Sequence, residues 1–339
     1  MPAHIVILLA SFVVILAGSE MFTNGVEWAG ERMRLSEAAV GSLLAAVGTA
    51  LPETLIPAVA LVMGGGAPGA HSEVGVGAII GAPLMLSTIA LFVMGIAALA
   101  FRDRRRRIAL RVPRIDARRD IGFFLPVFML GLAVGVVHLG LNVRYLLAAL
   151  LLVAYVGYAA VVLRIARDAG SEVEHGLYLE LLLRGEPLNP RNPPVAAQVV
   201  IGVVAILFGA REFVQQIIFL SEHANVSPGV LSLILSPLAT ELPEKYNAVV
   251  WIRQSKDNLA LANITGAMVF QSCIPVALGL AFTPWRLTGP ELLGGAIGIA
   301  SAALLWVNLR DGELGTPTLM AGGIAYIMFI VGLGWLGAI

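Results

Sequence analysis

Two short segments of this sequence place a threonine, a proline and a glutamate at identical spacing within apolar surroundings. The first reads Thr49-Ala-Leu-Pro-Glu53, and the second reads Thr240-Glu-Leu-Pro-Glu244. A proline inside a helix removes a backbone donor and displaces the carbonyl one turn earlier, which leaves carbonyl oxygens without intrahelical partners. We therefore expect Pro52 and Pro243 to open their helices. Freed carbonyls, threonine hydroxyls and carboxylates form the all-oxygen shell that hard cations require.

Glu53 and Glu244 each lie in the middle of an apolar run. An isolated carboxylate at the centre of a bilayer costs several kcal/mol on most scales, so a cation or a proton must accompany each one. Two glutamates balance the charge of one divalent ion, and Ca2+ takes about six to eight oxygen ligands. The alternative is a pair of structural kinks with protonated, hydrogen-bonded carboxyls. The equivalent placement of the two residues favours cation ligation.

The composition requires these segments to be carried by membrane helices. Of the 339 residues, 58% are hydrophobic and 13% are charged, and the mean hydropathy is +0.87, whereas soluble domains carry about 25% charged residues. A bilayer-spanning helix takes about 20 apolar residues. This excludes a soluble globule and predicts an all-α polytopic membrane protein with ten transmembrane helices. The expected spans are 5–28, 37–63, 74–101, 121–142, 145–166, 196–220, 229–252, 258–282, 291–309 and 317–338.

The basic residues predict the orientation of these spans, because Lys and Arg near span ends stay on the cytoplasmic side. The segment from Arg102 to Arg119 contains nine arginines. With this loop inside, 18 basic residues fall on the cytoplasmic side, and only Arg144 and Arg286 fall outside. Both termini are then non-cytoplasmic, and we expect the cell (inner) membrane. Nothing basic precedes the apolar run from Ile5, so we expect the N-terminal segment to be retained.

An internal repeat relates the two halves of the chain. Gly18 to Glu53 aligns without gaps onto Gly209 to Glu244, with nine identities in 36 positions. Five spans in each half mean that the second copy crosses the membrane in the opposite sense, which predicts inverted repeats with a site near the midplane. The expected organisation is a first half at 1–166, a cytoplasmic linker at 167–195 and a second half at 196–339.

The two motifs resemble the alpha repeats of the cation/calcium antiporter superfamily, which includes the sodium/calcium exchangers. The family pattern is G-T-S-x-P-E, and the segments here read G-T-A-L-P-E from Gly48 and A-T-E-L-P-E from Ala239. The resemblance covers nearly the whole chain, as ten spans in two sets of five. It implies that Glu53 and Glu244 are the central ion-binding carboxylates, with a hydroxyl or carbonyl oxygen from Thr49 and Thr240.

Several family positions are changed, and the changes bear on the transported ion. The serine of G-T-S is Ala50 in the first repeat and Glu241 in the second. In the following spans the family's G-S-N gives way to Gly81-Ala-Pro and Gly266-Ala-Met, and the polar position four residues after the serine is Leu86 or Gln271. The first repeat has lost side-chain oxygens, whereas the second has gained a carboxylate and an amide. Glu241 and Gln271 therefore join the predicted metal-binding set, and separate side-chain sites for several sodium ions are in question.

Two cations within the spans complete the set of candidates. Lys245 lies four residues after Glu241, a neighbouring position on a helix, so it either neutralises Glu241 as a tethered cation or extends its apolar stem toward water. Arg211 occupies the repeat position of Glu20. Opposite charges at symmetric places predict an ion pair or gate between spans one and six, with Glu212 as a competing partner and separate solvated side chains as the alternative.

The function that follows is secondary cation antiport, with Ca2+ exchanged for Na+. The alternative is a proton-coupled antiporter of Ca2+ or another divalent cation, since a proton needs only a carboxylate. Neither H-E-x-x-H nor G-x-S-x-G occurs, so we expect no enzyme and no cofactor. The expected partners are small inorganic cations and the lipid bilayer, with no nucleic acid and no obligate protein partner.

Four further features carry structural expectations. Gly77 and Gly81 form a G-x3-G pattern that favours close helix packing. The segment Leu177–Leu183 forms either a short helix on the membrane surface or a solvated linker. We expect Asn263 and Thr265 to face the site or to bond between helices, and His138 to be an interfacial residue.

Overall fold

The computed structural model describes residues 1–32, 45–65, 69–112, 114–137, 139–165, 176–184, 192–309 and 312–339. The helices of the first half are α1 (Pro2–Arg32), α3 (Ala45–Met63), α4 (Ala70–Met85), the π-helix η2 (Leu86–Ala90), α5 (Leu91–Ala100), α6 (Arg102–Arg105), α7 (Arg114–Val137) and α8 (Leu141–Ile165). They are followed by α9 (Tyr178–Arg184), α10 (Asn192–Ala224), α11 (Pro228–Thr240), α12 (Leu242–Arg253), α13 (Asp257–Phe282), α14 (Gly289–Asn308) and α15 (Thr316–Trp335). Two short strands, β1 (Leu110–Arg111) and β2 (Glu313–Leu314), pair antiparallel.

Within these ranges, eight helices are long and apolar enough to cross a membrane. They are Pro2–Ala29, Ala70–Ala100, Ala117–Val137, Leu141–Val162, Pro193–Ala224, Asp257–Phe282, Gly289–Asn308 and Thr316–Trp335. Each corresponds to one of the ten expected spans. The other two expected spans, 37–63 and 229–252, contain the shorter apolar helices Glu53–Met63 and Pro228–Thr240.

The helical path breaks at Glu241. Helix α11 ends at Thr240 and α12 begins at Leu242, with Pro243 in its first turn, where a missing N–H has no intrahelical partner to lose. The predicted opening at Pro243 is therefore confirmed. The equivalent opening predicted at Pro52 is wrong, because α3 is helical from Ala45 to Met63. A proline alone does not open a membrane helix, since neighbouring groups can satisfy the freed carbonyl.

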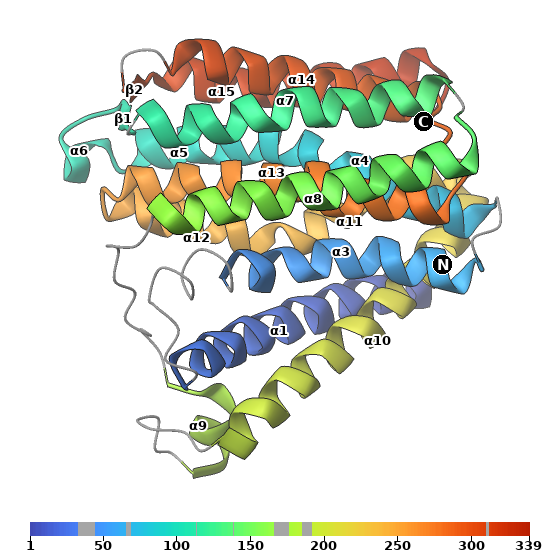
Figure 1. Cartoon of the computed structure of the whole chain (residues 1–339), viewed down its shortest axis with the longest axis horizontal. Coiled ribbons are helices and arrows are strands. Elements are labelled where there is room, and N and C mark those ends of the chain that lie inside the picture. Colours follow the sequence, from blue (N-terminus) through green and yellow to red (C-terminus); the bar gives the residue numbers. More distant parts are fainter. Residues whose placement is uncertain are drawn as a thin grey trace.

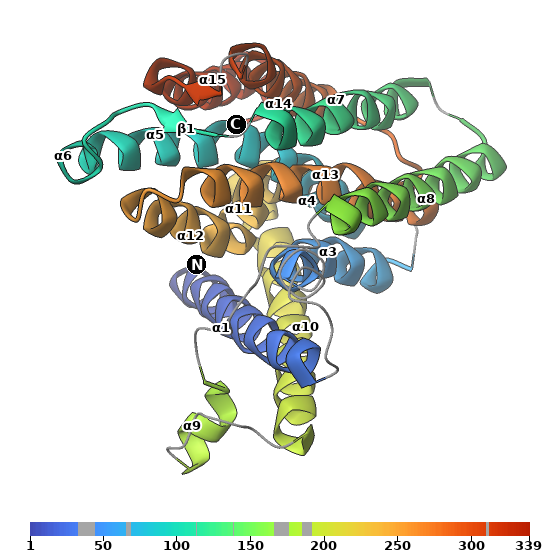
Figure 2. The same ribbon diagram turned by 60° about the vertical axis from the view of Figure 1, so that its left-hand side comes forward.

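The centre of the bundle is formed by α13 and by the continuous helical segment α4–η2–α5. Nearly all of α4 is buried, and α13 contacts α3, α4, α7, α8 and α12. Helices α14 and α15 cover one side, and α1 and α10 lie side by side on the opposite side, next to α3 (Figure 2). The elements that carry the proline motifs, α3 and α11–α12, therefore lie against the central helices.

Helices α1 and α10 pack antiparallel through small residues. The Cβ of an alanine at Gly18 would lie 3.0 Å from the Gly202 carbonyl oxygen, and one at Gly209 would lie 3.1 Å from the Ser11 carbonyl oxygen. These two contacts exchange under the repeat alignment, because residues 11 and 18 correspond to residues 202 and 209. The two helices thus meet symmetrically, and glycine permits the close approach.

Helices α4 and α11 meet in the same way. A Cβ at Gly77 would collide with the Gly229 carbonyl oxygen, and one at Gly81 with the Leu233 carbonyl oxygen. The Ser232 hydroxyl also donates a hydrogen bond to the Val74 carbonyl oxygen at 2.7 Å. The prediction that Gly77 and Gly81 serve close helix packing is confirmed.

We expect Gly81→Ala to lower the thermal unfolding temperature of the detergent-solubilised protein, because overpacking a tight contact costs about 1–3 kcal/mol. Gly266, which aligns with Gly81 in the repeat, has open space around it. The matched control Gly266→Ala should unfold at the same temperature as the parent or slightly above it, since alanine is favoured over glycine inside a helix by roughly 0.5–1 kcal/mol. Equal unfolding temperatures for the two variants would contradict the packing argument.

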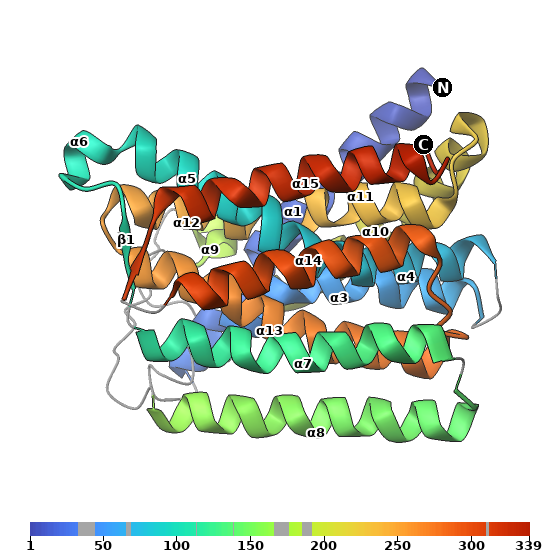
Figure 3. The ribbon, with the colours of Figure 1, turned by 90° about the horizontal axis from the view of Figure 1, so that it is seen from above.

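Both chain ends lie at one end of the bundle, and α6 and the β1–β2 pair lie at the other (Figures 1 and 3). At the arginine-rich end, Arg105 donates to both carboxylate oxygens of Asp257 at 2.7 and 2.8 Å, with both side chains fully buried. Arg107 donates to the same carboxylate at 3.0 Å, and the Arg111 backbone N–H at 2.9 Å. These bonds fasten the loop after α5 to the start of α13.

The segment between the halves contains the short helix α9, which matches the helix alternative for Leu177–Leu183. Leu177 is buried against Trp28 and Val195, and the Gln198 side chain accepts from the Leu179 N–H at 2.7 Å. Helix α9 is therefore anchored to α1 and α10. Arg34, Arg167, Arg191, Arg310, His138 and most of the expected linker lie outside the described residues.

Candidate cation site

Three carboxylates are buried where α3 meets the break between α11 and α12. Glu53 lies on α3, Glu241 occupies the break itself, and Glu244 lies in the first turn of α12. Glu53 is 5% exposed, and the other two are fully buried. The negative charge of Glu53 acts on both Glu241 and Glu244, and that of Glu241 acts on Glu244. A helix N-terminus favours negative charge, so the break at Glu241 suits both glutamates of the second motif.

Gln271 connects the first motif to the centre of the bundle. Its side-chain amide on α13 donates a hydrogen bond to Glu53 Oε2 on α3. Gln271 is fully buried. The amide therefore fixes the orientation of the Glu53 carboxylate, although the two residues are 218 positions apart in the sequence.

Lys245 lies against the second motif. Its Nζ donates to Glu241 Oε2 at 2.9 Å and to the Glu241 carbonyl oxygen at 3.3 Å. The helical spacing persists across Pro243, because the Lys245 N–H bonds to the Glu241 carbonyl oxygen at 3.2 Å. The Lys245 side chain is 7% exposed, so the ammonium points to Glu241 rather than to water.

Five side-chain oxygens of this group have no hydrogen-bond partner although they are buried. They are Glu53 Oε1, Glu241 Oε1, both carboxylate oxygens of Glu244 and Gln271 Oε1. A buried oxygen without a partner loses its hydration without compensation. All five are hard oxygen donors of the kind that Ca2+ and Na+ prefer. The donor set therefore fits a cation, which would replace the missing partners.

The described carboxylates do not form a complete coordination site for a metal ion. Across the ranges that the structure describes, no three His, Cys, Asp or Glu side chains are close enough to hold one metal ion. Thr240 is buried, and its hydroxyl donates to the Ser236 carbonyl oxygen at 3.2 Å. Thr49 lies in the part of α3 for which only the backbone is described. Ion binding thus requires the side chains to converge further.

The predicted ion pair between Glu20 and Arg211 is not formed. Both side chains are exposed, and neither has an oppositely charged partner within 4 Å among the described residues. The antiparallel register explains this. Gly202 packs between Gly18 and Phe22, so Glu20 is level with Gly202, about 13 Å along the helix axis from Arg211. Instead, burial and the negative charges of Glu20 and Glu27 raise the pKa of Tyr178. Glu212, half-buried next to Arg211, is likewise without a charged partner in the described part of the chain.

Sequence reasoning missed the buried acid Asp120 on α7, which lies outside the carboxylate group. Its carboxylate accepts from the Tyr158 hydroxyl at 2.6 Å and from the Thr265 hydroxyl at 2.7 Å, and Arg119 pairs with it at 3.1 Å. Thr265 therefore bonds between helices, which was one of its two expected roles. The sequence does contain a signal for this cluster, because Asp120 directly follows Arg119 at the start of the apolar run from Ile121.

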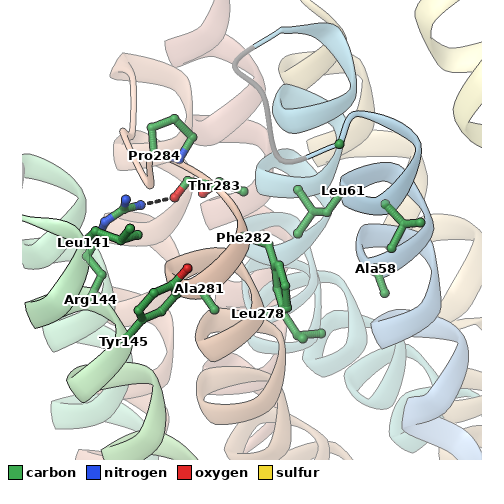
Figure 4. Close-up of a pocket in the computed structure, with 12 residues that line it drawn as sticks. Ala58, Leu61, Leu141, Arg144, Tyr145, Leu278, Ala281, Phe282, Thr283 and Pro284 are labelled. Carbon is green, nitrogen blue, oxygen red and sulfur yellow. Dashed lines mark hydrogen bonds between the residues drawn. The ribbon is translucent and has the colours of Figure 1, made fainter.

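A separate cavity of about 560 Å³ lies where α3 and α13 end and α8 begins (Figure 4). Its lining is largely apolar and includes Leu61, Leu278 and Phe282. Arg144 lies at this cavity and donates to the Thr283 carbonyl oxygen. Leu61 is about 12 Å along α3 from Glu53, so this cavity and the carboxylate group are distinct.

Comparison with known proteins identifies the class. Residues 3–164 and 195–336 match the family described as sodium/calcium exchanger protein. CaxA of Alkalimonas amylolytica is 24% identical over 339 residues, which cover 96% of each chain. The inner membrane protein YrbG of Escherichia coli (strain K12) is 24% identical over 186 residues, 52% of this chain and 55% of YrbG.

Two solved structures share the fold. The H+/Ca2+ exchanger CAX superposes with a TM-score of 0.74 at 18% identity, covering 97% of this chain and 81% of that one. The sodium-calcium exchanger NCX_Mj superposes with a TM-score of 0.62 at 18% identity, covering 97% and 98%. Long apolar helices around buried carboxylates, together with these matches, define a multi-pass integral membrane antiporter. The chain belongs to the sodium/calcium exchanger protein family, as the resemblance of its two motifs predicts.

Proposed function

We propose that this protein exchanges Ca2+ for Na+ by alternating access around Glu53 and Glu244. The observation that carries the proposal is the group of five buried oxygens without partners, contributed by α3, by the α11–α12 break and by α13. Glu241, Gln271 and Thr240 complete the described ligand candidates, and Thr49 is assigned by its place in the motif. These ligands come from both halves of the chain, so a bound cation links the halves.

We propose further that the halves, 1–166 and 196–339, are inverted repeats of five spans, joined by a cytoplasmic linker at 167–195. The antiparallel packing of α1 against α10 supports this, because equivalent helices run in opposite directions when the repeats are inverted. The location of both chain ends at one end of the bundle supports an even number of spans. We propose that the arginine-rich loop at the other end is cytoplasmic and that both termini are non-cytoplasmic, because Lys and Arg near span ends stay on the cytoplasmic side. The proposed location of the protein is the cell (inner) membrane.

The exchange cycle follows from the cost of buried charge. An empty site would carry unbalanced carboxylates through a low-dielectric region, which opposes the switch between inward-facing and outward-facing states. A loaded site is electrically balanced and can switch. Competition between Ca2+ and the counter-ion for the same carboxylates then couples the two fluxes, and leak through the empty protein is suppressed.

A second candidate is exchange of H+ for Ca2+ or for another divalent cation. Ala50, Ala82, Leu86 and Ala267 occupy family positions that carry polar side chains, and their loss removes sodium ligands but leaves carboxylates that can accept protons. The fold is shared with both an H+/Ca2+ and a sodium-calcium exchanger, so it is compatible with either coupling ion.

The test is Ca2+ uptake into proteoliposomes under an imposed Na+ gradient, compared with an imposed pH gradient. We expect the Na+ gradient to drive Ca2+ uptake. Uptake driven by the pH gradient alone would replace the first candidate with the second. The protein must be incorporated into the liposomes, and its cooperative unfolding in detergent must show that it is folded. If such protein moves no Ca2+ under either gradient, Ca2+ is not the substrate.

A further inference from the structure

Among the described residues, the cation site contains more buried carboxylates than ammonium groups. Three carboxylates are buried there, Glu53, Glu241 and Glu244, together with the single ammonium of Lys245. The Coulomb interactions that act on Glu53 and Glu244 come from this same group of residues. When all four groups are ionised, the described residues of the site have a net formal charge of minus two.

Other buried charges of the described chain are satisfied elsewhere. Arg105 pairs with Asp257 at the arginine-rich end, and Asp120 is bonded by Tyr158, Thr265 and Arg119. Glu291 accepts the backbone N–H of Thr288 at 2.9 Å in the capping box of α14. Arg105 and Arg119 therefore pair with aspartates outside the cation site, and Glu291 is held at a helix N-terminus.

The Lys245 ammonium lies where a monovalent cation would otherwise be needed. It contacts a Glu241 carboxylate oxygen at 2.9 Å and the Glu241 carbonyl oxygen at 3.3 Å, which are oxygen ligands that a bound ion would also use. It differs from a bound ion because it is covalently attached and cannot leave. Glu241 stands at the family's serine position, so this protein has added a carboxylate and its own counter-cation together.

We infer that Lys245 permanently replaces one monovalent cation, so that one divalent ion exchanges for two monovalent cations and each cycle moves no net charge. This inference rests on the proposed antiport function and adds its stoichiometry. Glu53 and Glu244 remain as the two charges to be neutralised, either by one divalent ion or by two monovalent ions. Only these two balanced loads avoid moving a net charge through the low-dielectric region.

The test is the voltage dependence of the Ca2+ distribution in proteoliposomes at a fixed gradient of whichever coupling ion drives uptake. A potassium diffusion potential set by valinomycin varies the voltage. Movement of one net charge per cycle would change the equilibrium Ca2+ ratio about 50-fold per 100 mV. We expect a change of less than about 2-fold for the parent protein. A parent ratio that shifts by about 50-fold per 100 mV overturns the inference.

Variants of the ion pair test the role of Lys245. Lys245→Met leaves three unpaired carboxylates, so a third monovalent ion should enter the cycle and the ratio should become voltage-dependent by about 50-fold per 100 mV. The double variant Lys245→Met, Glu241→Gln restores two charges and should be voltage-independent again. The exposed Lys256 supplies the control Lys256→Met. A voltage-independent Lys245→Met or a voltage-dependent double variant would contradict the inference.

The two proposals fail in different ways. Absence of Ca2+ flux in the parent protein under every gradient rejects the antiport function itself. Ca2+ flux that depends on voltage leaves antiport intact and rejects only the role of Lys245. If both variants lose all flux, the voltage dependence of the parent protein alone decides.

Discussion

Glu244→Gln is expected to reduce Ca2+ flux in proteoliposomes by about 100-fold or more, because removal of one partner from a buried charge pair costs about 3–5 kcal/mol. The substitution preserves the size of the side chain and removes one of the two charges that balance a divalent ion. Both Glu244 carboxylate oxygens are buried without a hydrogen-bond partner. A bound cation would be their partner in the parent protein, and the neutral amide of the variant binds it more weakly. Glu53→Gln should have a similar effect.

The matched control is Glu222→Gln, a change of the same chemistry at an exposed position on α10. This variant should transport like the parent protein. The unfolding temperature of each variant in detergent separates loss of transport from loss of folding. Normal Ca2+ flux through Glu244→Gln would contradict the assignment of this carboxylate as a cation ligand.

Gln271→Leu is expected to weaken the apparent Ca2+ affinity by about 10- to 100-fold, the usual effect of removing a group that orients a metal ligand. The amide of Gln271 holds one oxygen of Glu53 and supplies an unpartnered oxygen of its own. Its removal leaves Glu53 free to turn away from the cation. The measurement is the Ca2+ concentration that gives half-maximal uptake.

Gln198→Leu is the control for Gln271→Leu, because Gln198 is also fully buried but lies at the α1–α10 contact. Its side chain bonds to the Met21 carbonyl oxygen at 2.9 Å and to the Asn24 side chain at 2.8 Å. Loss of these bonds should lower the unfolding temperature with little change in Ca2+ affinity. If both variants changed the affinity equally, a specific role for Gln271 would be excluded.

The sequence by itself determined the class of this protein and the residue types of its site. In a bilayer, a long apolar run with few charges satisfies its backbone hydrogen bonds by forming a helix. Eight of the expected spans appear as long helices. The two T-x-L-P-E segments identified the family. The i, i+4 spacing of Glu241 and Lys245 anticipated the contact between them, because both lie on one local turn of backbone.

The tertiary structure decided every relation that depends on how separate helices pack. The bond between Gln271 and Glu53 joins α13 to α3, and no local pattern specifies it. The expected pairing of Glu20 with Arg211 failed because the register of two antiparallel helices sets which residues face each other. Likewise, Pro243 begins a new helix whereas Pro52 lies within one. Local sequence fixes chemistry and periodicity, but register and burial arise only when helices meet.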